Sequence, residues 1–459
     1  MKKKCHNIFM LILKIILGLF GLGIVVFVHE LGHFLAARLA GIDVDAFSIG
    51  WGNPILKKKI GKTEYRLGMF PVGGYCKMKG DSDYNNEAYV NLQNGIKPEE
   101  GSYLAAGPAK RMLVCFGGPF FNLIFAVLLL SMLWGFGFEL DTLGNKIILA
   151  SELNPGVTYP ADAAGLQTGD RIIEIAGKET SYYHQVQESI VLNPERELPV
   201  TVERNGEIIH LAITPSLDRS SGAGRIGVYF WTDPVIGIVH EDSPAYRAGL
   251  LPQDIITSAN GIRIENTMDF YKIMELNPGV LTIEYNRNGN TGYTQFTREE
   301  YEAGIGLTWA VINYRTPKLS FHGAILEGIK QGWKTLTISI KSLRLLFKGI
   351  DLTMAVSGPV RITYMIGEMA TQGFGQGLGI GLRSIMDFLA LISIALCVMN
   401  LLPLPILDGG MIILFLVELI RRKPAHPKAI AILQNCGIVI IFSIMLFALF
   451  GDIMFFVRN

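Results

Sequence analysis

Four long apolar stretches constrain this chain more than any other feature of its sequence. Each is long enough, or nearly long enough, to cross a membrane as a helix: residues 5–28 (with Lys14 as their charged residue), 112–138, 388–407 and 429–451. A helix needs about 20 apolar residues to cross the hydrocarbon core of a bilayer. Hydrophobic residues make up 50% of the chain and charged residues only 18%, which is too apolar for a set of soluble domains. The sequence therefore predicts a polytopic α-helical membrane protein with about four transmembrane helices.

The distribution of basic residues predicts the orientation of these helices. Lysine and arginine are frequent between the first two stretches, from Arg38 to Arg111, and recur in residues 421–428 between the last two. Segments rich in Lys and Arg face the cytoplasm, although Lys2, Lys3 and Lys4 favour the opposite orientation. The polar residues between the second and third stretches should therefore lie outside. The net charge of +1 gives no indication of nucleic-acid binding.

A pattern in the polar part of the chain occurs twice, which indicates a duplicated domain. Pro160-Ala161, Gly165-Leu166, Asp170, Gly177 and Asn193-Pro194 recur 84 residues later as Pro244-Ala245, Gly249-Leu250, Asp254, Gly261 and Asn277-Pro278. The pattern, followed by a short strand, a glycine turn and a helix, resembles bacterial PDZ domains. Such α/β domains take an extended peptide along a strand edge. Two rigid spacers that bind nothing would fit the same pattern.

A further helix is predicted over residues 323–348. Its apolar stripe steps by 3 or 4 residues, beside a row of basic residues, through Ile329, Trp333, Leu336, Ile340, Leu343 and Phe347. This pattern is typical of a helix on the membrane surface. A helix packed on the duplicated domains is the alternative.

The segment from His29 to His33 is an H-E-x-x-H motif that continues the first apolar helix. Positions i and i+4 share a helix face, so both imidazoles can bind one zinc ion while Glu30 flanks a zinc-bound water. Such a zinc ion lowers the pKa of the water to about 7 and polarises a carbonyl group, and Glu30 would carry the water's proton to the leaving amine. Polar residues at the end of a membrane span are costly unless they are used.

A third ligand is expected, because catalytic zinc sites use three protein ligands and a water. No third histidine extends the motif, and the five cysteines form no CxxC pair. Two prolines and two glycines interrupt the third apolar stretch between Asn400 and Gly410, and the freed backbone groups must line a protein-walled or wet cavity. Asp408 in this segment is the candidate ligand. A structural kink with a solvated aspartate is the alternative.

Three motifs in this order resemble the site-2 protease family, specifically the bacterial regulator-of-sigma-E protease type with tandem PDZ domains. They are H-E-L-G-H (29–33), G-G-P-F-F-N (117–122) and N-L-L-P-L-P-I-L-D-G-G (400–410). The resemblance covers nearly the whole chain. It implies zinc as the cofactor, His29, His33 and Asp408 as metal ligands, Glu30 as the catalytic base, and Asn400 near the active site.

The resemblance also implies a membrane-associated β-hairpin region after the first helix. Gly50 and Gly52 match the family's G-x-G turn, with Trp51 where Phe is usual, and residues 65–78 contain P-V-G-G-Y-C-K-M with Cys76 where Val is common. A helical substrate must unwind before it is cut, and a strand edge gives its backbone new partners. We therefore expect Asn400, Gly50 and Gly52 to contact the substrate.

The expected organisation divides the chain into eight segments. They are a first transmembrane helix with the H-E-L-G-H motif (1–41), a cytoplasmic-side membrane-associated β region (42–111), a second transmembrane helix (112–138), PDZ-like domains 1 (139–221) and 2 (222–316), an amphipathic juxtamembrane region (317–386), a third transmembrane segment with the L-D-G-G motif (387–420) and a fourth transmembrane helix (429–456).

The resemblance predicts an intramembrane zinc metalloprotease of the bacterial inner membrane, with its active site toward the cytoplasm. Its expected partners are the lipid bilayer and single-pass membrane proteins, either anti-sigma-factor-like chains first cut outside by a site-1-type protease or signal-peptide remnants. Two rivals stay open. One is a gluzincin whose third ligand is a downstream glutamate, and the other is a PDZ membrane scaffold with a structural or vestigial metal site.

Overall fold

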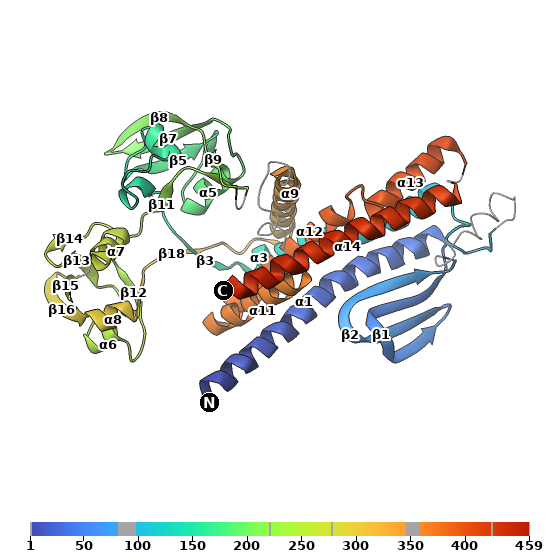
Figure 1. The fold of residues 1–459 in the computed structure, drawn as a ribbon, viewed down its shortest axis with the longest axis horizontal. Coiled ribbons are helices and arrows are strands. Elements are labelled where there is room, and N and C mark those ends of the chain that lie inside the picture. The colour runs from blue at the N-terminus through green and yellow to red at the C-terminus, as the bar shows by residue number, and fades with distance from the viewer. Residues whose placement is uncertain are drawn as a thin grey trace. The chain divides into compact units, whose positions relative to one another are not determined.

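The structure is a computed structural model that describes residues 2–80, 98–219, 222–276, 279–345, 358–423 and 426–458. Two compact units are present (Figure 1). The first comprises Met1–Phe138 and Thr316–Asn459, and the second comprises Glu139–Arg315. The repeat pair Asn277-Pro278, residue Phe347 of the predicted helix and part of the basic segment between Arg38 and Arg111 (residues 81–97) lie outside the described residues.

Seven helices form most of the described part of the first unit. They are α1 (Lys2–Ala40), α3 (Pro108–Phe136), α9 (Phe321–Leu345), α11 (Pro359–Gln376), α12 (Leu378–Asn400), α13 (Asp408–Arg421) and α14 (Pro427–Arg458). Four segments within them are long and apolar enough to cross a membrane: Phe9–Ala40, Pro108–Phe136, Leu378–Asn400 and Ile432–Phe455. The four predicted spans are thus confirmed by length and composition, and the chain has the character of a membrane protein.

The third span begins earlier and ends more sharply than the sequence analysis placed it. We expected a segment over 387–420, but α12 starts at Leu378 and stops at Asn400, and α13 is a separate helix. Arg383 and Asp387, which make the start of α12 look polar, pair at i and i+4 with Nε and Oδ2 3.4 Å apart. The predicted amphipathic region likewise contains two helices, α9 and α11, and α9 packs against α3 and α12.

Lys14 of the first span forms an ion pair with a residue of another helix, α11. Its Nζ lies 2.5 Å from Glu368 Oε2, and Glu368 Oε1 accepts a hydrogen bond from Gln372 at 2.7 Å. The two helices approach closely here, because a Cβ atom at Gly18 or Gly367 would overlap the backbone of the facing helix. The close packing and the ion pair together explain how a lysine is accommodated in this apolar helix.

A bent pair of long strands, β1 (Val44–Ile60) and β2 (Thr63–Met78), follows α1. Residues 46–49 are flanked on one side by 74–77 and on the other by 64–67. Among the described strands, β1 is the one that pairs with 74–77. The inner face packs on the end of α1, where the rings of Phe34 and Phe47 lie 5.2 Å apart. The β region is thereby attached beside the H-E-x-x-H motif.

The second unit contains two similar halves, each with its own hydrophobic core. The first half has a sheet in the order β6-β5-β7-β8 and the second a sheet in the order β14-β13-β15-β16. The strands and helices of the first half are β4 (Ile147–Leu149), η2 (Ala150–Glu152), α4 (Pro160–Ala163), β5 (Arg171–Ile175), β6 (Lys178–Glu179), α5 (Tyr183–Val191), β7 (Leu198–Arg204), β8 (Glu207–Ile213), β9 (Ser216–Leu217), β10 (Gly224–Arg225) and β11 (Val228–Phe230). Those of the second half are β12 (Ile236–Val239), α6 (Pro244–Arg247), β13 (Ile255–Ala259), β14 (Ile262–Arg263), α7 (Thr267–Glu275), β15 (Val280–Arg287), β16 (Asn290–Thr297), α8 (Arg298–Glu302) and β17 (Leu307–Trp309).

An ion pair between a buried aspartate and a partly exposed arginine occurs at the same place in both halves. Asp170 binds Arg204 through two hydrogen bonds of 2.7 and 2.8 Å, and Asp254 binds Arg287 through two of 2.6 Å. Burial raises the pKa of Asp254, but the hydrogen bonds from Arg287 and the Leu251 amide outweigh it and hold that pKa below its ordinary value. The shared arrangement agrees with the repeat found in the sequence, while the PDZ identity of the halves stays a prediction.

The chain leaves the first unit and returns to it at a single hydrogen-bonded junction. The Phe138 amide donates to Thr316 Oγ1 at 2.8 Å, and the Thr316 amide donates to the Phe138 carbonyl at 2.9 Å. Beyond it, β3 (Glu139–Thr142) pairs with β18 (Ile312–Arg315) in antiparallel register. The second unit is therefore inserted in the first through two adjacent strands.

Candidate metal centre

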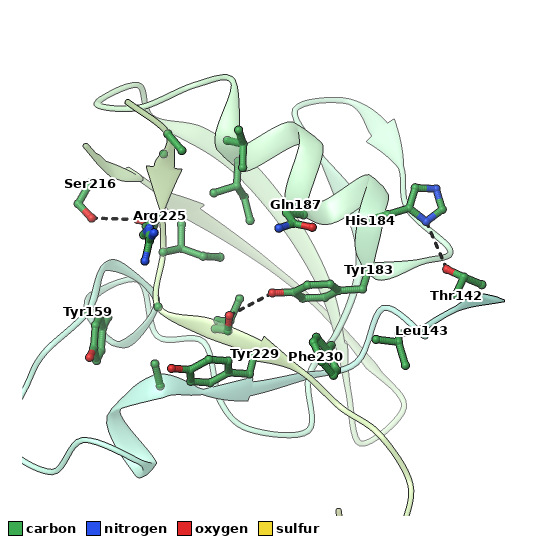
Figure 2. Close-up of a pocket in the computed structure, with 18 residues that line it drawn as sticks. Thr142, Leu143, Tyr159, Tyr183, His184, Gln187, Ser216, Arg225, Tyr229 and Phe230 are labelled. Carbon is green, nitrogen blue, oxygen red and sulfur yellow. Dashed lines mark hydrogen bonds between the residues drawn. The ribbon is translucent and has the colours of Figure 1, made fainter. Parts of the chain in front are cut away.

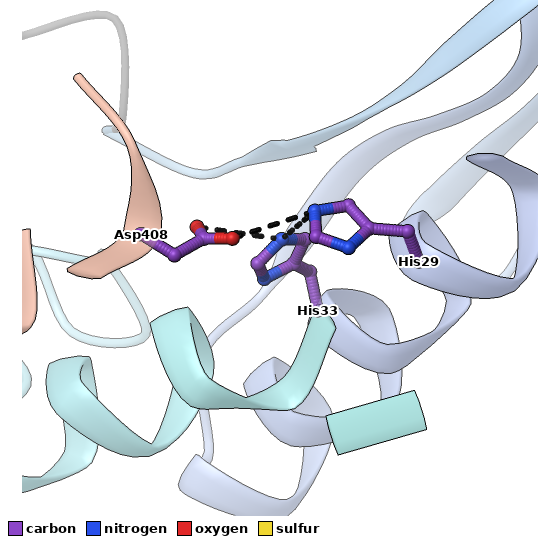
Figure 3. Close-up of side chains that lie close together, drawn as sticks. All are labelled: His29, His33 and Asp408. Carbon is purple, nitrogen blue, oxygen red and sulfur yellow. Dashed lines mark hydrogen bonds and ion pairs between the residues drawn. The ribbon is translucent and has the colours of Figure 1, made fainter. Parts of the chain in front are cut away.

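Three predicted ligands converge near the end of α1 (Figure 3). His29 and His33 lie one helical turn apart, and their Nε2 atoms are separated by 3.1 Å. Asp408, the first residue of α13, places Oδ2 3.4 Å from His29 Nε2 and Oδ1 3.6 Å from His33 Nε2. In the described residues these three side chains form the group whose donor atoms could share a metal ion.

The spacing of these donors fits a tetrahedral zinc ion. Zinc binds histidine nitrogen and carboxylate oxygen at about 2.0–2.1 Å, and tetrahedral ligands at that range are about 3.3 Å from one another. The two Nε2 atoms are 3.1 Å apart, and the nearest Asp408 oxygens, Oδ2 to His29 and Oδ1 to His33, are 3.4 and 3.6 Å away; these separations bracket this value. Two histidines and one carboxylate are also a ligand set that catalytic zinc sites use.

The broken segment before α13 places Asp408. Residues 401–407 leave the helical path between α12 and α13, and Ile406 adopts a left-handed conformation with φ 82°. That conformation is strained for a β-branched residue and persists only where the surroundings hold it. Gly409 and Gly410 leave no room for a Cβ atom, because the carbonyl oxygens of Leu401 and Leu404 face them. The two glycines thus let α13 start directly against the broken segment.

Residues along one face of α3 contact both histidine rings. The carbonyl oxygen of Val114 accepts a hydrogen bond from His33 Nδ1 at 2.8 Å, which leaves His33 Nε2 free to bind metal. Gly118, one turn further, makes room for the rings, because a Cβ atom there would lie 2.7 Å from Cε1 of His29 and of His33. A larger residue at this position would displace both ligands.

Asn122, the next residue on this face, contacts the other nitrogen of His29. Its Nδ2 lies 3.3 Å from His29 Nδ1, whereas its Oδ1 is buried with no hydrogen-bond partner in the described residues. The two ends of an amide are alike in shape. With the ends exchanged, Oδ1 accepts from His29 Nδ1–H, and His29 Nε2 is then available to a metal. In that orientation the buried Asn122 Oδ1 atom gains a hydrogen-bond donor, and His29 presents Nε2 to a metal.

The residues of the G-G-P-F-F-N motif had no role predicted from the sequence. Gly118 and Asn122 both belong to it and are four residues apart, the spacing of one helix face. Val114 acts through its backbone carbonyl, so its side chain gave no indication of this contact. The structure thus adds three residues of α3 to the candidate site.

Glu30 lies next to β2 of the β region. A Cβ atom at Gly74 of β2 would lie 3.5 Å from Glu30 Cγ. Asn400, the last residue of α12, places Nδ2 3.4 Å from His29 Nε2. Glu30 thus follows His29 in the chain and lies next to β2, and Asn400 lies beside His29 at the start of the broken segment.

Gly50 and Gly52 lie in β1, against the facing part of β2. Both have positive φ, 83° and 92°, and a Cβ atom at Gly50 would meet the backbone of Phe70. A Cβ atom at Gly52 would lie 3.1 Å from the ring of Phe70. Their glycine character is thus explained by chain geometry, and their contact with substrate stays a prediction.

A cavity of about 1020 Å³ lies in the first half of the second unit, between α5 and residues 223–230 (Figure 2). Tyr183 of α5 points into it and donates a hydrogen bond to the Val228 carbonyl at 3.1 Å. β11 has one strand neighbour, β4, among the described residues. A helix facing a strand with an unpaired side is the arrangement that accepts an added peptide strand.

Aromatic side chains connect the corresponding elements of the second half. Trp309 of β17 donates from Nε1 to the Tyr271 hydroxyl of α7 at 3.0 Å, and its ring lies 5.3 Å from that of Phe270. These contacts join α7 directly to β17. The two halves therefore differ in the space between helix and strand.

Comparisons with known proteins agree with this geometry. Residues 17–444 match peptidase family M50. A protein of Treponema pallidum named "Putative zinc metalloprotease" is 36% identical over 447 residues, which cover 96% of this chain and 99% of the relative. The regulator of sigma E protease of Haemophilus influenzae is 30% identical over 455 residues, which cover 94% of this chain and 96% of the relative.

Proposed function

Because this chain belongs to peptidase family M50 and is a zinc metalloprotease with an intramembrane protease function, we propose that His29, His33 and Asp408 hold its zinc ion and that Glu30 is its general base. The convergence of the two Nε2 atoms and the Asp408 carboxylate at 3.1 to 3.6 Å carries this assignment. A gluzincin arrangement would need a glutamate as third ligand, whereas the position of Asp408 beside both histidines supports an aspartate.

The chemistry follows from the positions of the side chains. Zinc, when bound, lowers the pKa of water and polarises the scissile carbonyl group. Glu30 accepts the proton of the attacking water and delivers it to the leaving amine. Val114 and Asn122 hold the two imidazoles through their Nδ1 atoms, which fixes both rings before substrate arrives. Asn400 lies close enough to His29 to donate a hydrogen bond to a substrate carbonyl beside it.

The 74–77 segment of β2 is the proposed place beside which the substrate backbone unwinds. Among the described strands β1 is the partner of this segment, and Gly74 lies next to Glu30. A peptide that pairs with a strand of this region satisfies the hydrogen bonds that it loses on leaving its helix. We propose that the substrates are single-pass membrane proteins, such as anti-sigma-factor-like chains first cut outside by a site-1-type protease, or signal-peptide remnants.

The second unit is proposed to consist of two PDZ-like domains outside a bacterial inner membrane, with the metal centre toward the cytoplasm. The basic residues between the first two spans support this orientation. The cavity beside α5 supports peptide binding by the first domain, whereas the Trp309–Tyr271 contact joins helix to strand in the second. The pair would then act as a filter that excludes substrates with large external domains.

Two single substitutions test the metal centre against the scaffold alternative. Glu30→Gln keeps the ligands, so zinc should stay bound while cleavage of a membrane peptide stops for want of a base. Asp408→Asn weakens an anionic ligand, so zinc content itself should fall together with cleavage. Both are compared with the unaltered protein in detergent by metal analysis and peptide cleavage. Unchanged cleavage by Glu30→Gln would refute the catalytic assignment, and full zinc content in Asp408→Asn would place the third ligand elsewhere.

A further inference from the structure

A buried ion pair joins α3 to the helix that carries Asp408. Arg111 of α3 donates from Nη2 to Glu418 Oε2 of α13 at 2.7 Å. The side chains of Arg111 and Glu418 are only 7% and 1% exposed. The guanidinium also lies over the ring of Phe415, 4.5 Å from its centre, and Phe415 is fully buried. Arg111 therefore contacts two residues one turn apart on α13.

The pair is poorly explained as a contribution to stability alone. Taking two charges out of water costs about as much as their attraction returns, so apolar residues of similar size often serve stability equally well. A guanidinium and a carboxylate instead impose direction, because the planar fork of arginine fixes the angle and distance of its partner. Such a contact fixes the rotation of α13 about its own axis and its distance from α3.

The same face of α3 holds the rest of the metal centre. Arg111 is followed at spacings of 3, 4 and 4 residues by Val114, Gly118 and Asn122, the residues that bind or accommodate the two histidines. These spacings keep all four on one face of the helix. α13 runs unbroken from Asp408 to Arg421, so Glu418 is about 15 Å along the axis from Asp408. A rigid helix transmits a rotation over that distance to its first residue.

We propose that Arg111 and Glu418 are positioning residues that orient α13 so that Asp408 faces His29 and His33. This inference rests on the proposed zinc ligation by Asp408. Gly409 and Gly410 hold the start of α13 against the broken segment, and the ion pair holds its second half. Without the pair the apolar contact of Phe415 persists, but it lacks the directionality that fixes rotation.

The test separates orientation from stability by removing one charge or both. Glu418→Gln and Arg111→Met each break the ion pair and keep one of its buried charges, whereas Arg111→Met/Glu418→Leu removes both charges. Glu368→Gln is the matched control, because it breaks another ion pair between helices of this unit, with Lys14. For each protein we would measure the thermal midpoint of the apo form, the rate of zinc transfer to a chelator, and the d–d absorption of the Co²⁺-substituted form.

The single variants at 111 and 418 should lose zinc at least about 10-fold faster than the unaltered protein, with an altered Co²⁺ spectrum. The double variant should recover the thermal midpoint but still lose zinc fast, whereas Glu368→Gln should lower the midpoint and keep normal zinc release. Normal zinc release by the double variant would overturn the proposal, since the pair would then be structural only. If Asp408→Asn itself releases zinc normally, the ligand assignment fails, a result that is distinct from failure of the pair.

Discussion

Substitution of Gly118 by alanine is the sharpest test of the packing around the two histidines. The added methyl group would lie 2.7 Å from Cε1 of both His29 and His33, whereas carbon atoms pack at about 3.5–4.0 Å. The rings must therefore withdraw by about 1 Å, which exceeds the about 0.5 Å that a preorganised site tolerates. We expect zinc affinity to fall about 10-fold to 100-fold, equivalent to about 1.4–2.7 kcal/mol.

A matched control lies on the same helix. A Cβ atom at Gly135 would lie 3.7 Å from that of Ala324, an ordinary contact. Alanine is favoured over glycine inside a helix by about 1 kcal/mol, so helix propensity alone predicts that Gly118→Ala and Gly135→Ala both stabilise the protein. Steric contact with the rings predicts that only Gly135→Ala does.

Metal analysis after dialysis against a graded chelator series, with thermal unfolding of each apo protein in detergent, measures both effects. Gly135→Ala should match the unaltered protein in zinc affinity and unfold at the same or a higher temperature. If Gly118→Ala binds zinc as tightly as Gly135→Ala, the described placement of the rings against α3 is wrong.

Three further predictions concern the rest of the chain. A cysteine at Lys58 should react with a membrane-impermeant thiol reagent only from the cytoplasmic side and one at Glu203 only from outside, and reversed labelling would refute the orientation. Removal of residues 139–315, with a short linker from Phe138 to Thr316, should leave cleavage of short substrates intact and relax selectivity toward full-length ones, whereas complete loss in a correctly inserted protein would mean that the second unit presents the substrate. The depressed pKa of Asp254 implies that its contribution to stability is present above the ordinary aspartate pKa and is lost as the pH falls through the lower folded-state pKa. The hydrogen-exchange protection factors of β13, corrected for the intrinsic pH dependence of amide exchange, should therefore fall with acid in the unaltered protein and depend less on pH in Asp254→Asn, and equal pH dependence would refute this linkage.

The features that sequence alone predicted are those encoded locally. An apolar run of sufficient length and an H-E-x-x-H spacing are both visible within one helix, and a cluster of prolines and glycines marks a broken helix wherever it falls. For this reason the spans, the histidine pair and the broken segment before Asp408 were all predictable. That Asp408 meets the histidines is a tertiary fact, and here the resemblance to a family supplied what residue patterns did not.

The features that sequence reasoning missed depend on partners far away in the chain. Lys14 is a charged residue within an apolar span, and the ion pair with Glu368 that accommodates it involves another helix. Arg383 and Asp387 moved the predicted start of the third span, because each counts as polar until their mutual pairing is known. Val114 acts through a carbonyl group and Gly118 through the absence of a side chain, and neither action leaves a chemical signature in the sequence.

The junction at Phe138 and Thr316 has an evolutionary consequence. Since the backbone closes on itself there, the two chain ends at which the second unit is inserted lie side by side. The entropy of closing a loop grows slowly with its length, so an inserted segment can lengthen without much added strain on the membrane helices. The repeat at a spacing of 84 residues indicates one such enlargement. Selection could thus double, trim or replace the inserted segment, while the residues that perform hydrolysis stayed in place.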